Sequence, residues 1–367
     1  MSKKADPSHP LYGANLATLW TVWRRSGGLA PHARMKMLAA FGAALGRLPF
    51  SLIERGTLAL RPKAGDHQAP IFILGHWRSG TTHLYNVLSK SDRFGYVSPF
   101  ATALPWDFLL LGRALEPLLV KKLPEHRYID RVRVDADSPQ EDEIALANMS
   151  ALSFYHGLYY PQKFDDYFQS GVFLDGVSAK ERTQWEGILR LFYKKLSIAQ
   201  PGRQLLIKNP VYTARPAQLR ALWPDAKFIH IHRNPAKVFL SMRNFYQALF
   251  AQFALQDYGH LDIDEIILAT YDRMMHNLRR ETADLPAHQF HELSFDAFQA
   301  DPMAEIGHIY DRLDMDGFAA ARPVFERYLG SVADYQKNSF TAPPDLRQKL
   351  MDRWGDHIRH WGYEDAL

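Results

Sequence analysis

The sequence predicts an α/β protein in which a central parallel sheet is flanked by helices. Three short apolar runs, Ile71–Leu74, Gln204–Ile207 and Lys227–Ile231, each pass into a loop and then into a helical pattern. A fourth run, Phe290–Leu293, precedes the helical stretch MAEIGHIYDRL. Alternation of strands and helices is typical of parallel strands that are covered by helices on both faces. We therefore expect a three-layer arrangement.

Two further segments accompany these units. Residues 1–66 are predicted to form a helical extension, because MKMLAAFGAALGRLPFSLIERG repeats apolar residues at spacings of three and four. Residues 67–367 are predicted to form a single domain with an insertion at about 95–200 that is rich in aromatic residues. An insertion at the carboxyl ends of parallel strands is a common place for a substrate pocket, so we expect a substrate cap. Packing of a helical subdomain explains the same aromatic residues equally well.

Composition narrows the classes of function. The chain has 367 residues, 47% of them hydrophobic, a formal charge of +4 and no tract of lysine or arginine, which favours an anionic small ligand over nucleic acid. It has no cysteine, which excludes disulfides, thiolate metal sites and a cysteine nucleophile. No secretory signal and no run of 18 uncharged apolar residues is present, so we expect a cytoplasmic protein. The histidines show no metal-ligand spacing, and we expect no metal.

The stretch FILGHWRSGTTHLYNVL, residues 72–88, contains a glycine-bounded loop between a strand and a helix. Gly75 and Gly80 bracket four residues, which is the spacing of a phosphate-binding P-loop. Such a loop surrounds an anion with backbone N–H groups and a helix N-terminus. The side chains that add donors are Arg78, Ser79, Thr81 and Thr82. Thr81 stands where a nucleotide triphosphatase has lysine, so the loop suits an anion but not ATP with magnesium. A plain tight turn would explain the glycine pair alone.

A second motif is FIHIHRNPAKVFLSMRNF, residues 228–245. Arg233 ends an apolar strand, Asn234–Pro235 makes a turn, and Ser241 lies on the second turn of the following helix. The guanidinium and the hydroxyl can converge on one phosphate. The alternative is an ordinary strand, turn and helix with a surface arginine.

Together, RSGTT and HRNPAKVFLS resemble the two cofactor-binding elements of sulfotransferases, which transfer a sulfuryl group from 3′-phosphoadenosine 5′-phosphosulfate (PAPS) to an acceptor. The resemblance runs from about Pro70 to the end and includes ELSFDAFQADP, which is similar to the family's late strand and acidic turn. It implies a P-loop-like fold with PAPS as co-substrate and no metal. Many members have proline where this chain has Trp77. The form GHWRSGTT is more like a bacterial subset, some members of which act on lipid-like alcohols.

The resemblance also implies roles for individual residues. It implies that the 5′-phosphosulfate is bound by Arg78, Ser79, Gly80, Thr81 and Thr82, and that the 3′-phosphate is bound by Arg233 and Ser241. Lys208 in LLIKNPVYTARP is the candidate cation on the sulfuryl side, since cytosolic sulfotransferases have a lysine-x-histidine there. The histidine is their base, but Pro210 stands in its place here, so the base must come from elsewhere. Lys337 in YQKNSF is a candidate contact to the 3′-phosphate or adenine. A solvated lysine is the alternative for both.

The segment DSPQEDEIALANM offers carboxylates for the base. Ser138, Pro139 and Glu141 have the N-cap, N1 and N3 spacing of a capping box, so Glu141 can serve the helix start alone. Relatives in the bacterial subset share a similar acidic helix start, which favours catalysis for one carboxylate. Glu143 lies nearly opposite Glu141 around a helix, so the two cannot face one acceptor. Both stay candidates, with Asp142 as the third.

The sequence therefore predicts a PAPS-dependent sulfotransferase that acts on a hydroxyl of a hydrophobic acceptor, lipid-like or aromatic, by in-line attack. Fixed donors and cations can offset the charge that develops on the transferred group. One alternative is a nucleotide-dependent small-molecule kinase with a degenerate P-loop. Another is a non-catalytic lipid- or membrane-binding protein, suggested by the amphipathic N-terminal region, but it leaves both anion motifs unexplained. Peripheral contact with a membrane stays open.

Overall fold

The computed structural model describes the chain except residues 1–8, 61–67, 113–114, 116–134, 136 and 334–342. The chain divides into two compact units. Unit 1 consists of Met1–His67, Val97–Ala199 and Ala248–Leu261, and unit 2 of Gln68–Tyr96, Gln200–Gln247 and Asp262–Leu367. The predicted division into an N-terminal extension and one domain over 67–367 stays a prediction.

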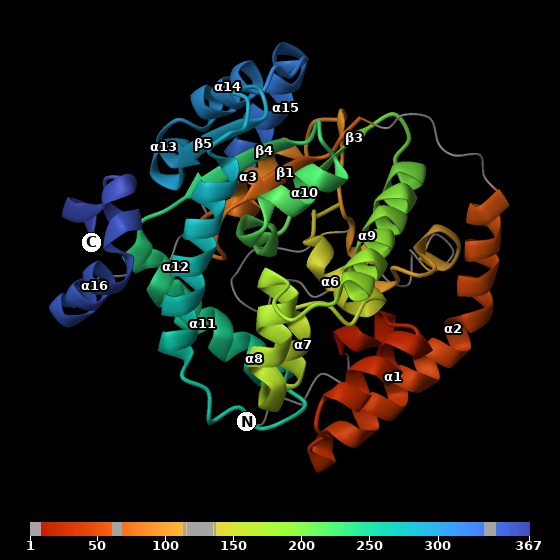
Figure 1. Ribbon diagram of the computed structural model, residues 1–367. Helices are drawn as coiled ribbons and strands as arrows, with labels where there is room; N and C mark the ends of the chain where they lie inside the picture. The colour runs from red at the N-terminus through yellow and green to blue at the C-terminus, as the bar shows by residue number, and fades with distance from the viewer. Residues whose placement is uncertain (1–8, 61–67, 113–114, 116–134, 136, 334–342) are drawn as a thin grey trace. The chain divides into compact units, whose positions relative to one another are not determined.

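Unit 2 is built around a parallel sheet, as predicted (Figure 1). Within the described residues the sheet has five strands in the order β2-β3-β1-β4-β5. Their bounds are β1 Ile71–Leu74, β2 Phe94–Gly95, β3 Gln204–Lys208, β4 Lys227–His232 and β5 Phe290–Ser294. The four predicted strands are confirmed. Strand β2 was not predicted, because two residues carry no readable pattern.

Alternate side chains of β1 face two different helical layers. Ile71 and Ile73 belong to a buried apolar cluster that includes Leu84 of α3 (Thr81–Leu88). Phe72 points the other way and its ring lies 5.7 Å from that of Tyr212 and 5.8 Å from that of Trp223. Both faces of the strand are therefore buried, which explains its uninterrupted apolar sequence and confirms the three-layer prediction.

The helices of unit 2 include the four that were predicted after the strands. These are α3 (Thr81–Leu88), α10 (Pro216–Leu222), α11 (Pro235–Phe253) and α14 (Pro302–Arg312), and the last residues of α11, from Ala248 on, are assigned to unit 1. The others that the structure describes are η6 (Pro210–Ala214), α12 (Ile263–Thr282), α13 (Phe295–Ala300), α15 (Phe318–Ser331), α16 (Pro344–His360) and η7 (Glu364–Ala366).

Unit 1 is helical in the part that the structure describes. The predicted N-terminal helices are confirmed as α1 (Leu16–Arg25) and α2 (Arg34–Leu60), with short turns η1 (Pro10–Gly13) and η2 (Pro31–Ala33). The insertion forms α4 (Pro99–Ala103), η3 (Phe108–Gly112), α6 (Asp142–Met149), α7 (Tyr155–Tyr159), η4 (Pro161–Lys163), α8 (Phe164–Phe168), η5 (Gln169–Phe173) and α9 (Ala179–Ala199). Its aromatic residues largely pack on one another: the stacked rings of Phe164 and Phe168, for example, lie 5.1 Å apart.

The predicted capping box before α6 is wrong. The helix begins one turn later, so that Glu141 occupies the N-cap position in an extended conformation and its side chain makes no capping bond. The hydroxyl of Ser138 instead accepts a hydrogen bond from the N–H of Asp135 at 2.8 Å. The N–H of Gln140 donates to the carbonyl of Val97 at 2.8 Å, and this non-local bond holds the chain extended where the box required a helix.

Candidate anion-binding site

The carboxyl ends of three neighbouring strands carry the predicted anion-binding residues. Strand β1 lies between β3 and β4 in the sheet. The loop over residues 75–80 follows β1, Lys208 ends β3, and Arg233 follows β4. From β1 the chain continues to β2 at one edge of the sheet, and from β4 it continues to β5 at the other edge. Open α/β sheets bind ligands at such a point, so unit 2 places both motifs where its topology favours a site.

The loop after β1 follows a path that only small residues permit at its two ends. The φ angles of Gly75, Arg78 and Gly80 are +148°, +70° and +103°. Positive φ at these positions turns the chain sharply after β1, and the N–H of Ser79 closes the turn by donating to the carbonyl of His76 at 3.1 Å. A Cβ added at Gly80 would lie 2.1 Å from Cδ2 of Phe295, and one at Gly75 would lie 2.5 Å from the carbonyl oxygen of Ile231. Both glycines are thus required by geometry.

Arg78 is the loop residue that joins the two motifs. Its Nε donates to Oγ of Ser241 at 2.9 Å, and its carbonyl accepts from Nη1 of Arg233 at 3.3 Å. A non-glycine residue with positive φ costs about 1–2 kcal/mol, so these bonds hold a strained conformation in place. On the other side of β1, Nζ of Lys208 donates to Oγ1 of Thr82 at 3.3 Å. Five predicted residues therefore lie together.

Arg233 stacks on a ring that sequence reasoning did not single out. Its guanidinium carbon lies 4.6 Å from the ring centroid of Phe295, the first residue after β5. Burial lowers the pKa of Arg233, and Asp296 opposes that shift; the guanidinium stays charged. Phe295 directly follows a strand, as Arg233 does, so its position in the sequence could have identified it.

Two of the predicted anion ligands have a buried group without a hydrogen-bond partner in the part of the chain that the structure describes. The two groups are Oγ of Ser79 and Nε of Arg233. Buried donors are nearly always paired in folded proteins, so both are suited to an incoming anion. The crowding around Gly80 leaves room for backbone only at this position. A bare backbone at the start of a helix, with unpaired donors beside it, suits the phosphate groups of a nucleotide.

Trp77 and His76 pack beneath the loop within unit 2. Both are buried, and the ring centroid of Trp77 lies 5.4 Å from that of His76 and 6.5 Å from that of Phe245. Burial lowers the pKa of His76 to about 4, so its imidazole is neutral at pH 7. The tryptophan that replaces the family's proline is therefore a packing residue of this unit.

The carboxylates proposed for the base belong to unit 1. Glu143 is fully buried on α6, and Glu141 is half-buried just before it. Asp142 accepts a hydrogen bond from the hydroxyl of Tyr193 at 2.8 Å, which makes it a structural contact between α6 and α9. Whether these carboxylates act with the residues of unit 2 stays a prediction. Lys337 lies outside the described residues.

Comparison with known proteins agrees with this geometry. The profile described as "Sulfotransferase family" matches residues 70–319. The chain is 28% identical over 295 residues to the omega-hydroxy-beta-dihydromenaquinone-9 sulfotransferase Stf3 of Mycobacterium bovis and of Mycobacterium tuberculosis, covering 80% of this chain and 75% of the relative.

Two solved structures share the fold. Sulfotransferase STF1 from Mycobacterium tuberculosis has a TM-score of 0.64 at 17% identity, over 96% of this chain and 94% of that chain. Sulfotransferase STF9 from Mycobacterium avium has a TM-score of 0.69 at 15% identity, over 95% of this chain and 96% of that chain. At this identity the likeness bears on the fold alone, and it confirms the predicted P-loop-like arrangement.

We predict that Arg233→Ala weakens binding of adenosine 3′,5′-bisphosphate (PAP) about ten- to a hundredfold, since a hydrogen bond to a charged group contributes about 1.5–3 kcal/mol. Calorimetric titration would measure the change. Arg322→Ala is the matched control, because Arg322 is exposed and pairs with Glu326 of its own helix. Equal affinity of the Arg233 variant and the control would remove Arg233 from the site.

Gly80→Ala is expected to lower the free energy of unfolding by about 1–3 kcal/mol and PAP affinity at least tenfold, because the new methyl group meets Phe295 in a left-handed backbone. Denaturant unfolding and titration would test both effects. Gly330→Ala in α15 makes the same change with no atom within 4 Å, so it should keep PAP affinity and keep or slightly raise the free energy of unfolding. PAP binding at full strength by the Gly80 variant would contradict the assignment of this loop.

Proposed function

We propose a specific reaction for this chain, which belongs to the sulfotransferase family: transfer of a sulfuryl group from PAPS to a hydroxyl of a hydrophobic, lipid-like acceptor. The observation that supports it most directly is the hydrogen bond between Arg78 and Ser241. It joins the two motifs into one cationic site at the carboxyl ends of the strands, and its charge suits a nucleotide with two phosphate groups.

The roles of the residues follow from their positions. We assign the 5′-phosphosulfate to the N–H groups of the loop and to the loop's donors, which are Arg78, Ser79, Gly80, Thr81 and Thr82. We assign the 3′-phosphate to Arg233 and Ser241. The buried donors of Ser79 and Arg233 that have no partner among the described residues support this division. Lys337 is proposed as a further contact on the nucleotide side.

Lys208 supplies a second cation beside the loop, on the sulfuryl side. It is buried at the end of β3 and donates to Thr82, at the start of α3. From there its ammonium can offset the negative charge that develops on the bridging oxygen as the sulfuryl group leaves. A sulfuryl group carries less charge than a phosphoryl group, so fixed protein cations suffice for the role that lysine and magnesium share in nucleotide triphosphatases.

The acceptor hydroxyl needs a base, and we propose Glu143 for it, with Glu141 as the second candidate. Glu143 is buried in the first turn of α6. Asp142, its neighbour, is held by Tyr193 and serves structure. A positioned carboxylate that takes the hydroxyl proton during attack contributes about 10²–10⁴ to the rate.

The acceptor class is proposed from the relative, whose name describes a hydroxylated dihydromenaquinone as its substrate. Such a molecule carries its hydroxyl on an apolar chain. We propose an acceptor of this kind, an alcohol on a long apolar or aromatic body, and a place for the enzyme in the cytoplasm at the inner face of the membrane.

Transfer can be tested with ³⁵S-labelled PAPS and a lipid extract of the source cells. We predict that label enters the lipid fraction and that Glu143→Gln lowers kcat about 10²- to 10⁴-fold with PAP affinity unchanged. Asp142→Asn is the neighbouring control, expected to lower the melting temperature because it weakens the bond to Tyr193. Loss of kcat in Glu141→Gln instead would move the base to Glu141, and label in neither lipid nor polar products would contradict the reaction.

A further inference from the structure

Helix α2 is amphipathic in the reverse of the usual sense. Its buried residues recur every three or four positions along one side and include a polar and a charged residue: Met37, Ala40, Ala44, Ser51, Glu54 and Leu58. Arg47 falls in the same series and its side chain is nearly buried. The opposite side holds most of the large apolar residues of the helix. In a water-exposed helix the apolar stripe faces the core, so this arrangement needs an explanation.

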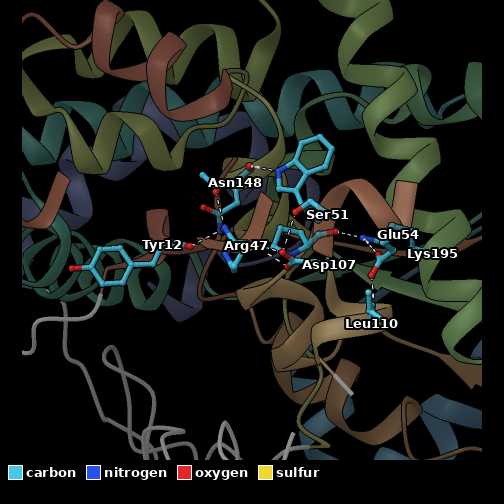
Figure 2. Close-up of polar contacts among 11 residues, drawn as sticks. Tyr12, Arg47, Ser51, Glu54, Asp107, Leu110, Asn148 and Lys195 are labelled. Carbon is cyan, nitrogen blue, oxygen red and sulfur yellow. Dashed lines mark hydrogen bonds and ion pairs between the residues drawn. The ribbon is translucent and has the colours of Figure 1, made fainter. Parts of the chain in front are cut away.

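The inward side is fixed by a buried polar network (Figure 2). Arg47 donates through Nη1 to both carboxylate oxygens of Asp107 at 3.0 Å, and through Nη2 to the carbonyls of Tyr12 and Ala14 at 3.0 and 2.7 Å. The hydroxyl of Ser51 donates to the same carboxylate at 3.0 Å. These bonds attach the middle of α2 to the rest of unit 1.

A second ion pair continues the network one turn further along the helix. Nζ of Lys195 on α9 lies 2.6 Å from Oε1 of Glu54, and both side chains are almost fully buried. The other oxygen of Glu54 accepts from the N–H of Leu110 at 2.9 Å. The packed side thus runs from Met37 to Leu58, about 30 Å at 1.5 Å per residue, all of it against unit 1.

The outward side of α2 is apolar and exposed. Leu38, Leu45 and Leu52 are seven residues apart, and therefore on one face; they are 64%, 62% and 55% exposed. Other exposed apolar residues of the helix are Met35, Leu48, Phe50, Ile53 and Leu60. Between Lys36 and Arg55 the charged residues are Arg47 and Glu54, both turned inward. Monomeric soluble proteins rarely expose an apolar face of this extent without a partner.

Helix α1, which contacts α2, also carries exposed aromatic and basic residues. Trp20, Trp23 and Arg24 are exposed and lie three and four positions apart, with the two indole centroids 5.2 Å apart and the Arg24 guanidinium 5.9 Å from the Trp20 ring. Helices α1 and α2 contact one another within unit 1. Tryptophan favours the boundary between lipid tails and headgroups, where arginine can reach phosphates.

The charge of the two helices selects the partner. Over residues 16–60 the sequence contains six lysines and arginines and one acidic residue, the buried Glu54. Exposed Arg34 and Arg55 lie toward opposite ends of α2. A second copy docked on this face would bring basic residues against basic residues. An anionic lipid surface offers the opposite charge.

We propose that the outward face of α2, together with Trp20 and Trp23 of α1, is a membrane-docking surface for an anionic lipid leaflet. Among the residues that the structure describes, α2 is the one helix that has the length and composition needed to cross a bilayer. Because its polar side is bonded to unit 1 along its length, it lies in the membrane plane with its leucines about 5–10 Å deep. Docking requires neither PAPS nor acceptor, so it does not depend on the proposed reaction.

Flotation of the full chain with vesicles tests the proposal. We expect binding to phosphatidylcholine vesicles that contain about one third phosphatidylglycerol, weaker binding to phosphatidylcholine alone, and release by salt. Leu45→Glu/Leu52→Glu should lower partitioning at least tenfold, with melting temperature and PAP affinity retained. Ala319→Glu/Ala320→Glu in the exposed first turn of α15 adds the same charge elsewhere and should bind like the unchanged chain.

Three results would overturn the proposal. Equal vesicle binding by the α2 variant and the α15 control would place the lipid contact elsewhere. Absence of vesicle binding, with a dimer in sedimentation that the α2 variant abolishes, would assign the face to a second copy. Retention of the bound chain in the membrane after alkaline carbonate extraction would mean that α2 spans the bilayer rather than lying on it.

Discussion

The path of the backbone between Gly75 and Gly80 is the constraint on which the rest of the candidate anion-binding site depends. Left-handed conformations at the two glycines and at Arg78 turn the chain sharply at the end of β1, and the ring of Phe295 leaves no room for a side chain at residue 80. With the chain on this path, Arg78 meets Ser241, and two motifs more than 150 residues apart share one hydrogen bond. The sheet order makes this possible, because β1 lies between the two strands that supply the other cations.

The two units use buried charge in different ways. Beneath α2 in unit 1, cation and carboxylate face one another in pairs, so the charge is compensated and holds a helix in place. At the strand ends of unit 2, Arg78, Arg233 and Lys208 gather charge of one sign within a short stretch of the sheet edge. Compensated pairs specify a structure, whereas a cluster of one sign attracts an anion of the opposite sign. This contrast separates the architectural network of the protein from its ligand site.

Local patterns predicted the four longer strands and both anion motifs, because an apolar run followed by a loop and a helix is visible within about 20 residues. Features set by distant contacts were not predictable. Helix α6 starts late because Gln140 bonds to Val97, and Phe295 joins the site only through the sheet order. The periodicity of α2 shows two faces, but the usual rule would turn Leu45 inward, and only the buried partners of Arg47 reveal the opposite orientation.

Direct titration of the protein with PAP in the presence of a metal chelator tests the central claim. We propose that the site binds the nucleotide through fixed cations and backbone donors. PAP should then bind without magnesium, and it should raise the melting temperature by an amount that grows with the ratio of ligand to Kd. Binding of ATP with magnesium, and none of PAP, would contradict it and would favour a phosphoryl-transfer enzyme.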